Sequence, residues 1–537
     1  MRAALTDDFT TTTAPATDVL VVGAGPVGLT LAIGLARAGV DCRIIERDGE
    51  FRTAGVRGKG VNPRTLEVFD DLGVVEPILD RGALNLGVRA YRGTRLVEEV
   101  DPAATNPPTP DRPYAGMLLI AQHQTEAVLR DRLAAYGLTV ETGTELVDHA
   151  ADADGVLAAL RRDGRTTTLR ARYLIGCDGG RSSVRKLAGI PFLGETWEEE
   201  RFIMASMELD GLDPEHLHIW NHPKFGAGAM TLVPMRQDGT WAVHAAVEPD
   251  EHGELPAPTL DTFRRLFAER AGLPGVRMHE PVWSTVWRPT VRLVERYRDG
   301  RVLLAGDAAH CQSAAGGQGM NTGVQDAHNL AWKLAAVLRG APDTLLDSYQ
   351  EERMPVARAS LAATAAHHKA AFGGADGGGA GVLTAQFRTM AVQGADLTGL
   401  SITYRGGPLG RDLDAATGIR AGDRAPDAPC TTADGTPTRL FDLFRGPHFT
   451  LLAFGDHPTL TELPSPTALP ALPALPALPA LPALRVATVR DPDGHAARAY
   501  GLRGGAVVLV RPDGHVSLTG ATADRATVTE HLRAFTG

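Results

Sequence analysis

Three glycine-containing segments hold the residues whose types and spacing could do chemistry. The first is GAGPVG at residues 23–28, between a β-branched run and a stretch with apolar residues at helical spacing. Gly23 permits a tight turn, Gly25 lets the backbone approach a pyrophosphate, and Gly28 lets helix and strand pack closely. Free N–H groups at the helix start would then face phosphate oxygens. The segment predicts a dinucleotide site, and the alternative is a glycine turn in another kind of α/β protein.

Glu46 supports this interpretation. Residues 18–22, 26–38 and 41–46 read as strand, helix and strand, which is the βαβ unit. The acid ends the second strand roughly 20 residues after the glycines, where a carboxylate can accept hydrogen bonds from ribose hydroxyls.

The second and third segments each place an aspartate beside a glycine at the end of an apolar strand. They are LIGCDGGRSSVRKLAG around Asp178 and VLLAGDAAHCQSAAGGQGMNTGVQDAHNLAWKL around Asp307. Taken alone, either aspartate could equally be a loop or cap residue. Glycines at 316, 317 and 319 leave room for a flat ring against the backbone. A helix expected over residues 321–338 would point its partly positive N-terminus at that ring, which favours a flavin that gains negative charge on reduction.

Length and composition bound the class of protein. The chain has 537 residues, 43% hydrophobic and 22% charged, which suits two or three domains able to bury a large cofactor. A net charge of -10 without a basic block argues against nucleic acid as a partner. The four cysteines form no CxxC pair, so we expect no disulfide framework, no metal site and a cytoplasmic location. We expect no membrane span, and a disordered tail at residues 1–17.

The middle of the chain changes character. Short alternating runs at 201–209, 228–234 and 240–247 predict an antiparallel sheet that could form a substrate floor. We therefore expect a nucleotide-binding domain at 18–190 and 290–365, interrupted by a substrate domain at 191–289. Trp220, Phe225 and Met230 are the candidate substrate contacts. For each of them, ordinary packing of the sheet is the alternative.

The carboxyl-terminal part reads as a separate unit. We expect a helix and loop linker at 366–417 and a domain at 418–537, with strands at 450–453 and 506–510. Residues 468–482 are tandem Ala-Leu-Pro units, which favour an extended path, either as a docking segment or as an expanded surface loop. Cys430 has no second thiol nearby in sequence, so dithiol exchange is not expected.

In their order and intervals the three segments resemble the group A flavoprotein monooxygenases, the para-hydroxybenzoate hydroxylase family. The similarity is greatest to the actinobacterial branch that hydroxylates aromatic polyketides and related natural products, and it covers about residues 18–365. It implies an α/β fold, with a Rossmann-like FAD-binding domain interrupted by an antiparallel substrate sheet. The tail resembles the thioredoxin-like extension of that branch.

The resemblance also implies roles for single residues in FAD binding. Gly23, Gly25 and Gly28 would hold the pyrophosphate, Glu46 the adenosine ribose, and Asp307 the ribityl chain. Arg47 would lie near the adenine, and Gln122 would touch FAD. Asp178 would serve both FAD and the nicotinamide cofactor, with Arg185 completing its fingerprint. Backbone donors to the flavin ring would come from Gly319, Met320 and Asn321.

The activity implied is hydroxylation of a phenolic or heteroaromatic natural-product intermediate with NAD(P)H and O2, through a C4a-hydroperoxyflavin. NADPH or NADH would dock transiently, since the sequence has no second GxGxxG after a strand. The alternatives are Baeyer–Villiger or antibiotic-inactivating oxygenation and, in another class, a flavin-binding protein without turnover. A homo-oligomer stays open.

No catalytic base is assigned. Arg57 could steady the flavin or a substrate oxyanion, and a solvated surface arginine is the alternative. His310 could carry protons, although a structural histidine is favoured. The chain departs from the family at Ala314, where a proline is common, and at Gln312, where some relatives carry a histidine. These changes leave the FAD fold intact and alter the pocket over the flavin.

Overall fold

The computed structural model describes residues 16–55, 58–196, 201–222, 225–312, 317–372, 398–455, 484–533 and residue 535. Several predicted features lie outside this described part of the chain. They are residues 1–15 of the tail, Arg57, Ala314, Gly316, residues 373–397 of the linker and the Ala-Leu-Pro units at 468–482.

The first sheet has eight strands and a parallel centre. Its strands are β1 (Thr17–Val22), β2 (Cys42–Ile45), β8 (Val140–Glu141), β9 (Glu145–Ala151), β10 (Val156–Arg162), β11 (Arg165–Gly176), β21 (Arg298–Asp299) and β22 (Val302–Leu304). Their order is β21, β22, β11, β1, β2, β8, and β10 and β9 extend β11 in the antiparallel sense. β1 pairs in parallel with both β2 and β11, so the turn after β1 lies at the carboxyl edge of a parallel sheet, where such folds bind nucleotides.

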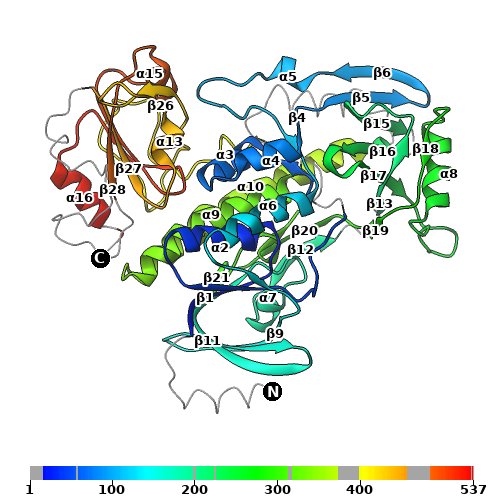
Figure 1. Ribbon diagram of the computed structural model, residues 1–537, viewed down its shortest axis with the longest axis horizontal. Coiled ribbons are helices and arrows are strands. Elements are labelled where there is room, and N and C mark those ends of the chain that lie inside the picture. Colours follow the sequence, from blue (N-terminus) through cyan, green and yellow to red (C-terminus); the bar gives the residue numbers. More distant parts are fainter. Residues whose placement is uncertain are drawn as a thin grey trace.

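Three helices lie together over this sheet: α2 (Pro26–Arg37), α6 (Gln122–Ala134) and α9 (Gln318–Leu338) (Figure 1). α2 and α9 cross closely, because a Cβ on Gly34 would lie only 2.7 Å from the Cβ of Ala331. α9 begins three residues before its predicted start. It is buried on nearly every side, and its first turn is therefore held rigidly.

The second sheet has seven strands. They are β19 (Trp283–Trp287), β13 (Arg201–Met207), β17 (Thr240–Val247), β16 (Gly226–Met235), β15 (His216–His222), β5 (Gly87–Arg92) and β6 (Arg95–Val100), in that order. α8 (Leu260–Arg270) covers one face through a core that includes Trp220, Met230 and Phe263. The opposite face carries a second cluster with Met204, Ala242 and Val233.

The prediction of an antiparallel sheet made only from residues 191–289 needs correction. β5 and β6 come from residues 87–100, and β5 pairs with β15 in parallel, so the sheet is mixed. The hairpin joins this sheet because Val88 and Val100 complete its second apolar cluster. Local alternation in sequence shows that a hairpin exists and does not show which sheet it will extend.

Three small sheets connect these layers. The first joins β12 (Phe192–Thr196), β20 (Thr290–Val294) and β23 (His310–Cys311), and the second joins β3 (Gly60–Val61), β7 (Leu118–Leu119) and β4 (Ala83–Leu84). The third pairs β14 (Leu209–Asp210) with β18 (Arg277–Met278). The remaining helices here are α3 (Pro63–Asp71), α4 (Val75–Arg81), α5 (Pro102–Thr105), α7 (Ser183–Leu187) and α10 (Asp347–Phe372).

The carboxyl-terminal unit has its own five-stranded sheet and core. The strand order is β24 (Arg411–Asp412), β30 (Val516–Gly520), β29 (Ala506–Val510), β27 (Phe449–Phe454), β28 (Leu484–Val489). A hairpin of β25 (Pro429–Thr431) and β26 (Pro437–Arg439) accompanies α13 (Leu440–Phe444), α15 (His495–Tyr500) and α16 (Arg525–Arg533). The unit lies beside α3 and the end of α9 (Figure 1).

Buried ion pairs join this unit to the rest of the molecule. Arg424 Nε lies 2.8 Å from Glu67 Oε2 of α3, and Arg511 Nη1 lies 2.6 Å from Glu352 Oε1 of α10. Burial alone would raise the pKa of Glu352, but Arg511 and Lys333 outweigh it and lower the pKa to about 2. A set of paired charges at a buried seam fixes one orientation between the two parts.

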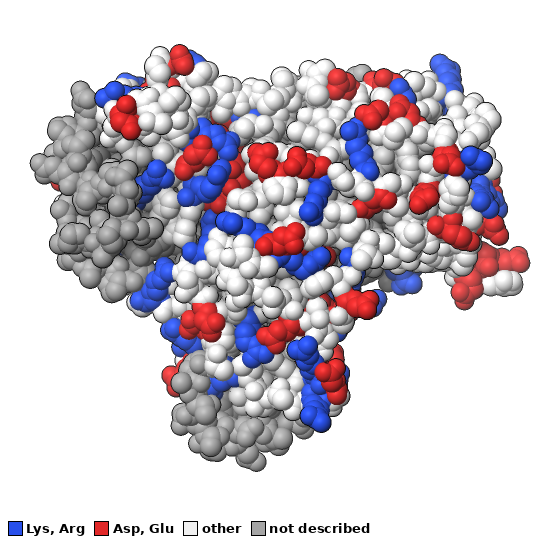
Figure 2. All heavy atoms as spheres, viewed as in Figure 1, with Lys and Arg blue, Asp and Glu red and all other residues white. Residues whose placement is uncertain are grey.

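One face of the molecule carries charged side chains of both signs. In the view of Figure 2, positive and negative side chains alternate, without a large patch of either sign. In the part of the chain that the structure describes, no helix is both long and apolar enough to cross a membrane.

Candidate active site

Close backbone packing holds the first glycine segment against the end of β11. A Cβ on Gly23, whose φ is +101°, would lie 2.5 Å from the carbonyl oxygen of Cys177. A Cβ on Gly28 would lie 1.9 Å from the carbonyl oxygen of Gly23. Only glycine fits at these two positions. A Cβ on Gly25 would meet no heavy atom within 4 Å, so the turn is open where α2 begins and its N–H groups point outward.

Glu46 lies directly beside this turn. Its Oε2 accepts a hydrogen bond of 3.0 Å from the backbone of Ala24, and its Oε1 accepts one of 3.1 Å from Asp48. Each carboxylate oxygen keeps a lone pair for a further donor, such as a ribose hydroxyl. Arg47 is exposed, and its guanidinium lies 3.7 Å from Asp48 at the rim of the turn.

Asp178 caps the short helix α7. Its Oδ2 accepts hydrogen bonds from the backbone of Ser183 at 2.6 Å and of Val184 at 3.2 Å. Its Oδ1 is buried and has no hydrogen-bond partner among the described residues. Burial raises the pKa of Asp178. An unpaired buried carboxylate oxygen next to Gly23 fits a donor supplied by a ligand.

Arg185 ties the second segment to the third. Its guanidinium donates to the carbonyl of Ala308 at 3.1 Å and to that of Gly180 at 2.9 Å, and it stacks on the ring of Phe192. These contacts occupy the guanidinium of the buried side chain and hold the second and third segments together. The geometry therefore gives Arg185 a positioning role.

Asp307 lies where the three segments converge. A Cβ on Gly323 of α9 would lie 2.7 Å from Val27 of α2 and 2.9 Å from the Cα of Gly306, so both helices press on the turn after β22. Asp307, in that turn, is exposed, and its Oδ1 would lie 3.9 Å from a Cβ on Gly319. Its carboxylate thus stands beside the first turn of α9, on the open side of the packing.

The first turn of α9 holds the predicted backbone donors to the flavin ring. Gly317 is the residue before the helix, with φ +63°, so the helix starts immediately before Gly319, Met320 and Asn321. The role of their N–H groups toward the flavin stays a prediction.

The side chain of Asn321 is fully buried and makes three hydrogen bonds. Its Oδ1 accepts from the backbone of Asn62 at 2.9 Å, and its Nδ2 donates to the carbonyls of Gly60 at 2.9 Å and Gly317 at 2.7 Å. These bonds connect the start of α9 to the segment that leads into α3.

Gln122 and Met320 flank this same segment. A Cβ on Gly58, whose φ is +55°, would lie 2.8 Å from Gln122 Oε1 and 3.4 Å from Met320 Sδ. Gln122 also donates to Glu126 at 2.7 Å. Gln122 and Met320 thus lie against Gly58, and Met320 belongs to the same first turn of α9 as Gly319, which lies beside Asp307.

His310 belongs to a buried network beneath the site. Its Nε2 lies 2.7 Å from Asp326 Oδ2, which also accepts from the backbone of Gly306 at 3.2 Å. Arg353 donates to the other oxygen of Asp326 at 2.7 Å. His310 is 1% exposed, so the geometry supports the structural alternative that the sequence already favoured over proton transfer to a substrate.

The predicted substrate contacts Trp220 and Met230 lie on the wrong face of the second sheet. Both are fully buried against α8, where Trp220 stacks on Tyr91 and donates to the carbonyl of Gly93 at 3.1 Å. Phe225 lies under the guanidinium of Arg270 from the same helix. Both faces of these strands are apolar, so alternation could not show which face looks toward the flavin-binding segments.

The inner face of the sheet is the better candidate for a substrate floor. Pairing of β13, β17, β16 and β19 places one set of side chains on it: Phe202, Met204, Thr231, His244, Trp283 and Trp287. All of these except Met204 are partly exposed, whereas the residues toward α8 are almost fully buried. The loop before β3 reaches this face, since a Cβ on Gly55 would lie 3.6 Å from the Trp283 ring.

Lys59 and His244 form a contact that the sequence did not reveal. Lys59 Nζ lies 2.8 Å from His244 Nε2, although 185 residues separate them. Burial lowers the pKa of Lys59 to about 8, and burial and Lys59 hold the pKa of His244 well below its usual value. Lysine offers only donors, so His244 accepts through Nε2 and is neutral.

The rarity of lysine in this chain could have singled out Lys59 in the sequence. The chain contains only five lysines among 54 lysines and arginines, and this one stands between two glycines in a segment expected beside the flavin. Nothing in the sequence pointed to His244, because one histidine on an apolar strand is most often a core residue.

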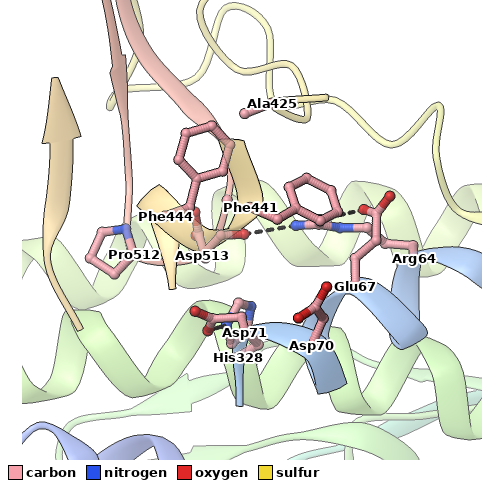
Figure 3. Close-up of a pocket in the computed structure, with 11 residues that line it drawn as sticks. Arg64, Glu67, Asp70, Asp71, His328, Ala425, Phe441, Phe444, Pro512 and Asp513 are labelled. Carbon is pink, nitrogen blue, oxygen red and sulfur yellow. Dashed lines mark hydrogen bonds and ion pairs between the residues drawn. The ribbon is translucent and has the colours of Figure 1, made fainter. Parts of the chain in front are cut away.

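A small pocket elsewhere lies between α3, α9 and the carboxyl-terminal unit (Figure 3). Its charged groups pair with one another or with neighbours. Arg64 bonds to Glu67, Arg439 and Arg445 pair with Asp70, and His328 lies 2.8 Å from Asp71. The pocket is part of the seam between the two units, and it is separate from the convergence of the three glycine segments.

The convergent segments suit an FAD molecule. Four features carry this fit: the open turn at Gly25, the buried oxygen Oδ1 of Asp178, the exposed Asp307 beside Gly319, and the helix start at Gly317. They offer an anion site for a pyrophosphate, partners for hydroxyl groups and a helix start for a flat ring.

Comparison with known families agrees with this geometry. A family model described as FAD binding domain matches residues 16–364, and one described as aromatic-ring hydroxylase, C-terminal, matches residues 419–537. The chain therefore belongs to the FAD-dependent aromatic-ring hydroxylases, an enzyme family, and the family predicted from the sequence is confirmed.

Individual relatives are similar over almost the whole chain. A flavin-dependent monooxygenase of Mycobacteroides abscessus is 38% identical, over 96% of this chain and 99% of its own. The 6-methylpretetramide 4-monooxygenase of Streptomyces rimosus is 35% identical, over 96% of this chain and 93% of its own. A ternary complex of aklavinone-11 hydroxylase with FAD and aklavinone superimposes with a TM-score of 0.79 at 28% identity, covering 98% of this chain and all of the other.

Proposed function

We propose that the protein is a monooxygenase that uses FAD, NADPH or NADH, and O2 to hydroxylate a phenolic or related aromatic natural-product intermediate. The observation that carries this proposal is the position of the α9 start. It lies between the three converging FAD segments and the loop at residues 58–60, from which Lys59 reaches the partly exposed inner face of the second sheet.

The residues have distinct duties in this proposal. Gly23, Gly25 and Gly28 hold the pyrophosphate, Glu46 a ribose, and Asp178 and Asp307 further hydroxyl groups. Gly319, Met320 and Asn321 hold the flavin ring. Bound FAD, once reduced by the nicotinamide cofactor, would supply the activation of O2. The protein holds the ring of the substrate against the inner sheet face and keeps water away during transfer.

Two relatives support the substrate class. The Streptomyces rimosus enzyme is a monooxygenase of 6-methylpretetramide, and aklavinone-11 hydroxylase was crystallised with aklavinone. We propose an aromatic polyketide or similar molecule as the substrate of this chain by analogy with them.

We also propose that the carboxyl-terminal unit is a structural, thioredoxin-like domain. All four cysteines are free, and the single one in this unit, Cys430, is buried. Burial raises the pKa of its thiol to about 11, which disfavours the thiolate that exchange chemistry needs.

The test begins with the purified protein. Release of FAD on denaturation, oxidation of NAD(P)H and uptake of O2 are measured with a panel of hydroxylated polycyclic aromatics. Incorporation of one atom from 18O2 into a product would support the proposal, and Asp307→Ala provides a control that should lack cofactor.

Other results would separate the alternatives. Ring expansion of the product, seen by NMR, would indicate Baeyer–Villiger chemistry. NAD(P)H oxidation that no aromatic compound stimulates, without any oxygenated product, would favour a flavin-binding protein without turnover.

A further inference from the structure

Lys59 and His244 come from different parts of the fold and meet on the inner face of the second sheet. We propose that this pair anchors the substrate by holding a phenolic hydroxyl of its aromatic ring as the phenolate. This inference rests on the proposed function and names the group by which the ring is recognised.

The main chain around Lys59 is fixed relative to the flavin-binding helix. The carbonyl of Lys59 accepts from the backbone of Ile120 at 2.9 Å, and the carbonyl of Gly60 accepts from the side chain of Asn321 at 2.9 Å. The neighbouring Gly58 lies against Gln122 and Met320. The lysine side chain therefore leaves a rigid point next to the start of α9 and extends toward β17.

Lys59 contacts an imidazole and no carboxylate within the described part of the chain. Its Nζ has no carboxylate of those residues within ion-pair distance, and the group that it contacts is a neutral imidazole. The fully buried Lys333, by contrast, has a carboxylate partner, with its Nζ 2.7 Å from Glu352 Oε2. Lys59 is partly buried, and a partly desolvated ammonium without a carboxylate is unfavourable, so a bound anion would remove that cost.

The surroundings select an aromatic anion. Met204 and Thr231 flank His244 on the neighbouring strands, and Trp283 and Trp287 lie on the same face. An apolar floor with one cation suits a flat ring that carries one ionisable hydroxyl.

The proton transfer balances without any other reactant. A phenol gives its proton to the amine form of Lys59, so that the O–H bond breaks, an N–H bond forms, and phenolate and ammonium result. The lowered pKa of Lys59 keeps part of the population as the amine near neutral pH. Arginine could not accept this proton, and the phenolate is the more electron-rich ring for oxygen transfer. His244 acts as a positioning residue, since it holds one N–H of the lysine and turns the others toward the ligand.

The test uses alizarin, a hydroxylated anthraquinone whose visible band shifts when a hydroxyl ionises. Binding to the FAD-loaded protein is followed at a pH below the pKa of the free dye. The wild type should bind alizarin with the spectrum of the anion. Lys59→Met should bind it at least tenfold more weakly, with the neutral spectrum. Lys59→Arg should recover the anion band, because its charge stabilises the phenolate while the phenol proton is released to the solvent. His244→Gln should show an intermediate loss of affinity.

Two matched variants control for general effects on the same domain. Arg277→Met removes an exposed cation, and His279→Gln removes an exposed imidazole, and both should bind the dye as the wild type does. FAD occupancy is measured for every variant, so that a loss of cofactor is recognised separately.

The inference is overturned if Lys59→Met keeps the anion band and the affinity, or if the wild type binds the dye in its neutral form or fails to bind it. The proposed function is judged independently by 18O incorporation in the wild type. Oxygenation that does not depend on Lys59 would refute the anchor and support the proposed function. An anion band that depends on Lys59, without any oxygenation, would support the anchor and refute the proposed function.

Discussion

The side-chain oxygen of Asn321 accepts a hydrogen bond from the backbone N–H of Asn62, 2.9 Å away, and so joins the first turn of α9 to the start of α3. One buried amide thereby holds together the helix start that would face the flavin and the segment that carries Lys59. Its two other bonds, to Gly60 and Gly317, close the same junction.

Asn321→Ala should lower the stability of the protein even without cofactor. The change removes the acceptor of the Asn62 N–H and a donor to the carbonyls of Gly60 and Gly317, at a cost of about 2–4 kcal/mol. Thermal unfolding of the apoprotein measures this, and FAD affinity should fall in parallel. Thr290→Ala, at a half-buried strand start, is a suitable comparison. An unchanged apoprotein that only binds FAD less well would show that Asn321 serves the cofactor directly.

Asp307→Ala should give largely colourless protein with normal stability. The carboxylate is exposed, so its removal leaves the core intact, whereas loss of a charged hydrogen bond to a ligand weakens binding by about tenfold or more. Flavin absorbance of the purified variant is the measurement, and Asp299→Ala, another exposed aspartate near the end of the same sheet, is the control. Full FAD occupancy in Asp307→Ala would show that Asp307 does not bind the cofactor.

Glu46→Ala should weaken FAD retention without changing the product. The substitution removes acceptors from the N–H groups of Ala24 and Asp48 as well as the ribose contact, so the turn itself should loosen. Glu46→Gln keeps an acceptor oxygen and should show a smaller effect. FAD dissociation constants and product identity are compared for the three proteins, and a changed site of oxygenation in either variant would contradict the assignment.

Arg511→Met should destabilise the protein far more than Arg405→Met. Arg511 pairs with Glu352 and Asp513 in the buried seam, and its loss removes a cation from both carboxylates, with Lys333 left as the ion-pair partner of Glu352. We expect a cost of about 3–5 kcal/mol. Arg405 pairs with Asp423 at the surface, where such a pair contributes less than about 1 kcal/mol. The melting temperatures of the two variants are compared with that of the wild type. An equal fall in both would show that the stability of the seam does not depend on its charges.

The carboxyl-terminal unit should lose stability as the pH falls from about 6.5 toward 4. Burial lowers the pKa of His515 and of His531 to about 4, below the ordinary 6.5. Between these two pH values the two histidines are protonated in the unfolded chain and neutral in the folded unit. Their stabilising effect is therefore complete above pH 6.5 and is lost as the pH drops through this window, by an amount on the order of a few kcal/mol. Asp427, whose pKa burial raises to about 6, acts in the opposite sense and offsets only part of the loss.

Melting temperatures at pH 7.5 and pH 5 measure this effect. His531→Leu should flatten the dependence, and the exposed His279→Gln should leave it unchanged. A wild-type melting temperature that does not fall at pH 5 would refute the expectation.

Local rules sufficed for the turns that need glycine and for the elements beside them. Gly23, Gly28 and Glu46 could be read from the sequence because a strand, a tight turn and a helix start are decided by neighbouring residues. The family resemblance added Asp178, Asp307, Gln122 and Met320. In the structure Asp178 lies against Gly23, Asp307 beside Gly319, and Gln122 and Met320 beside Gly58.

The tertiary structure alone decided which face of the second sheet looks toward the FAD segments. Trp220 and Met230 point to α8, and His244 points the other way, because a strand sends alternate side chains to opposite faces and both faces here are apolar. It also brought Lys59 to His244, and Arg511 to Glu352, across 185 and 159 residues. Such pairs depend on how whole sheets and helices pack, and no local pattern in the chain encodes that.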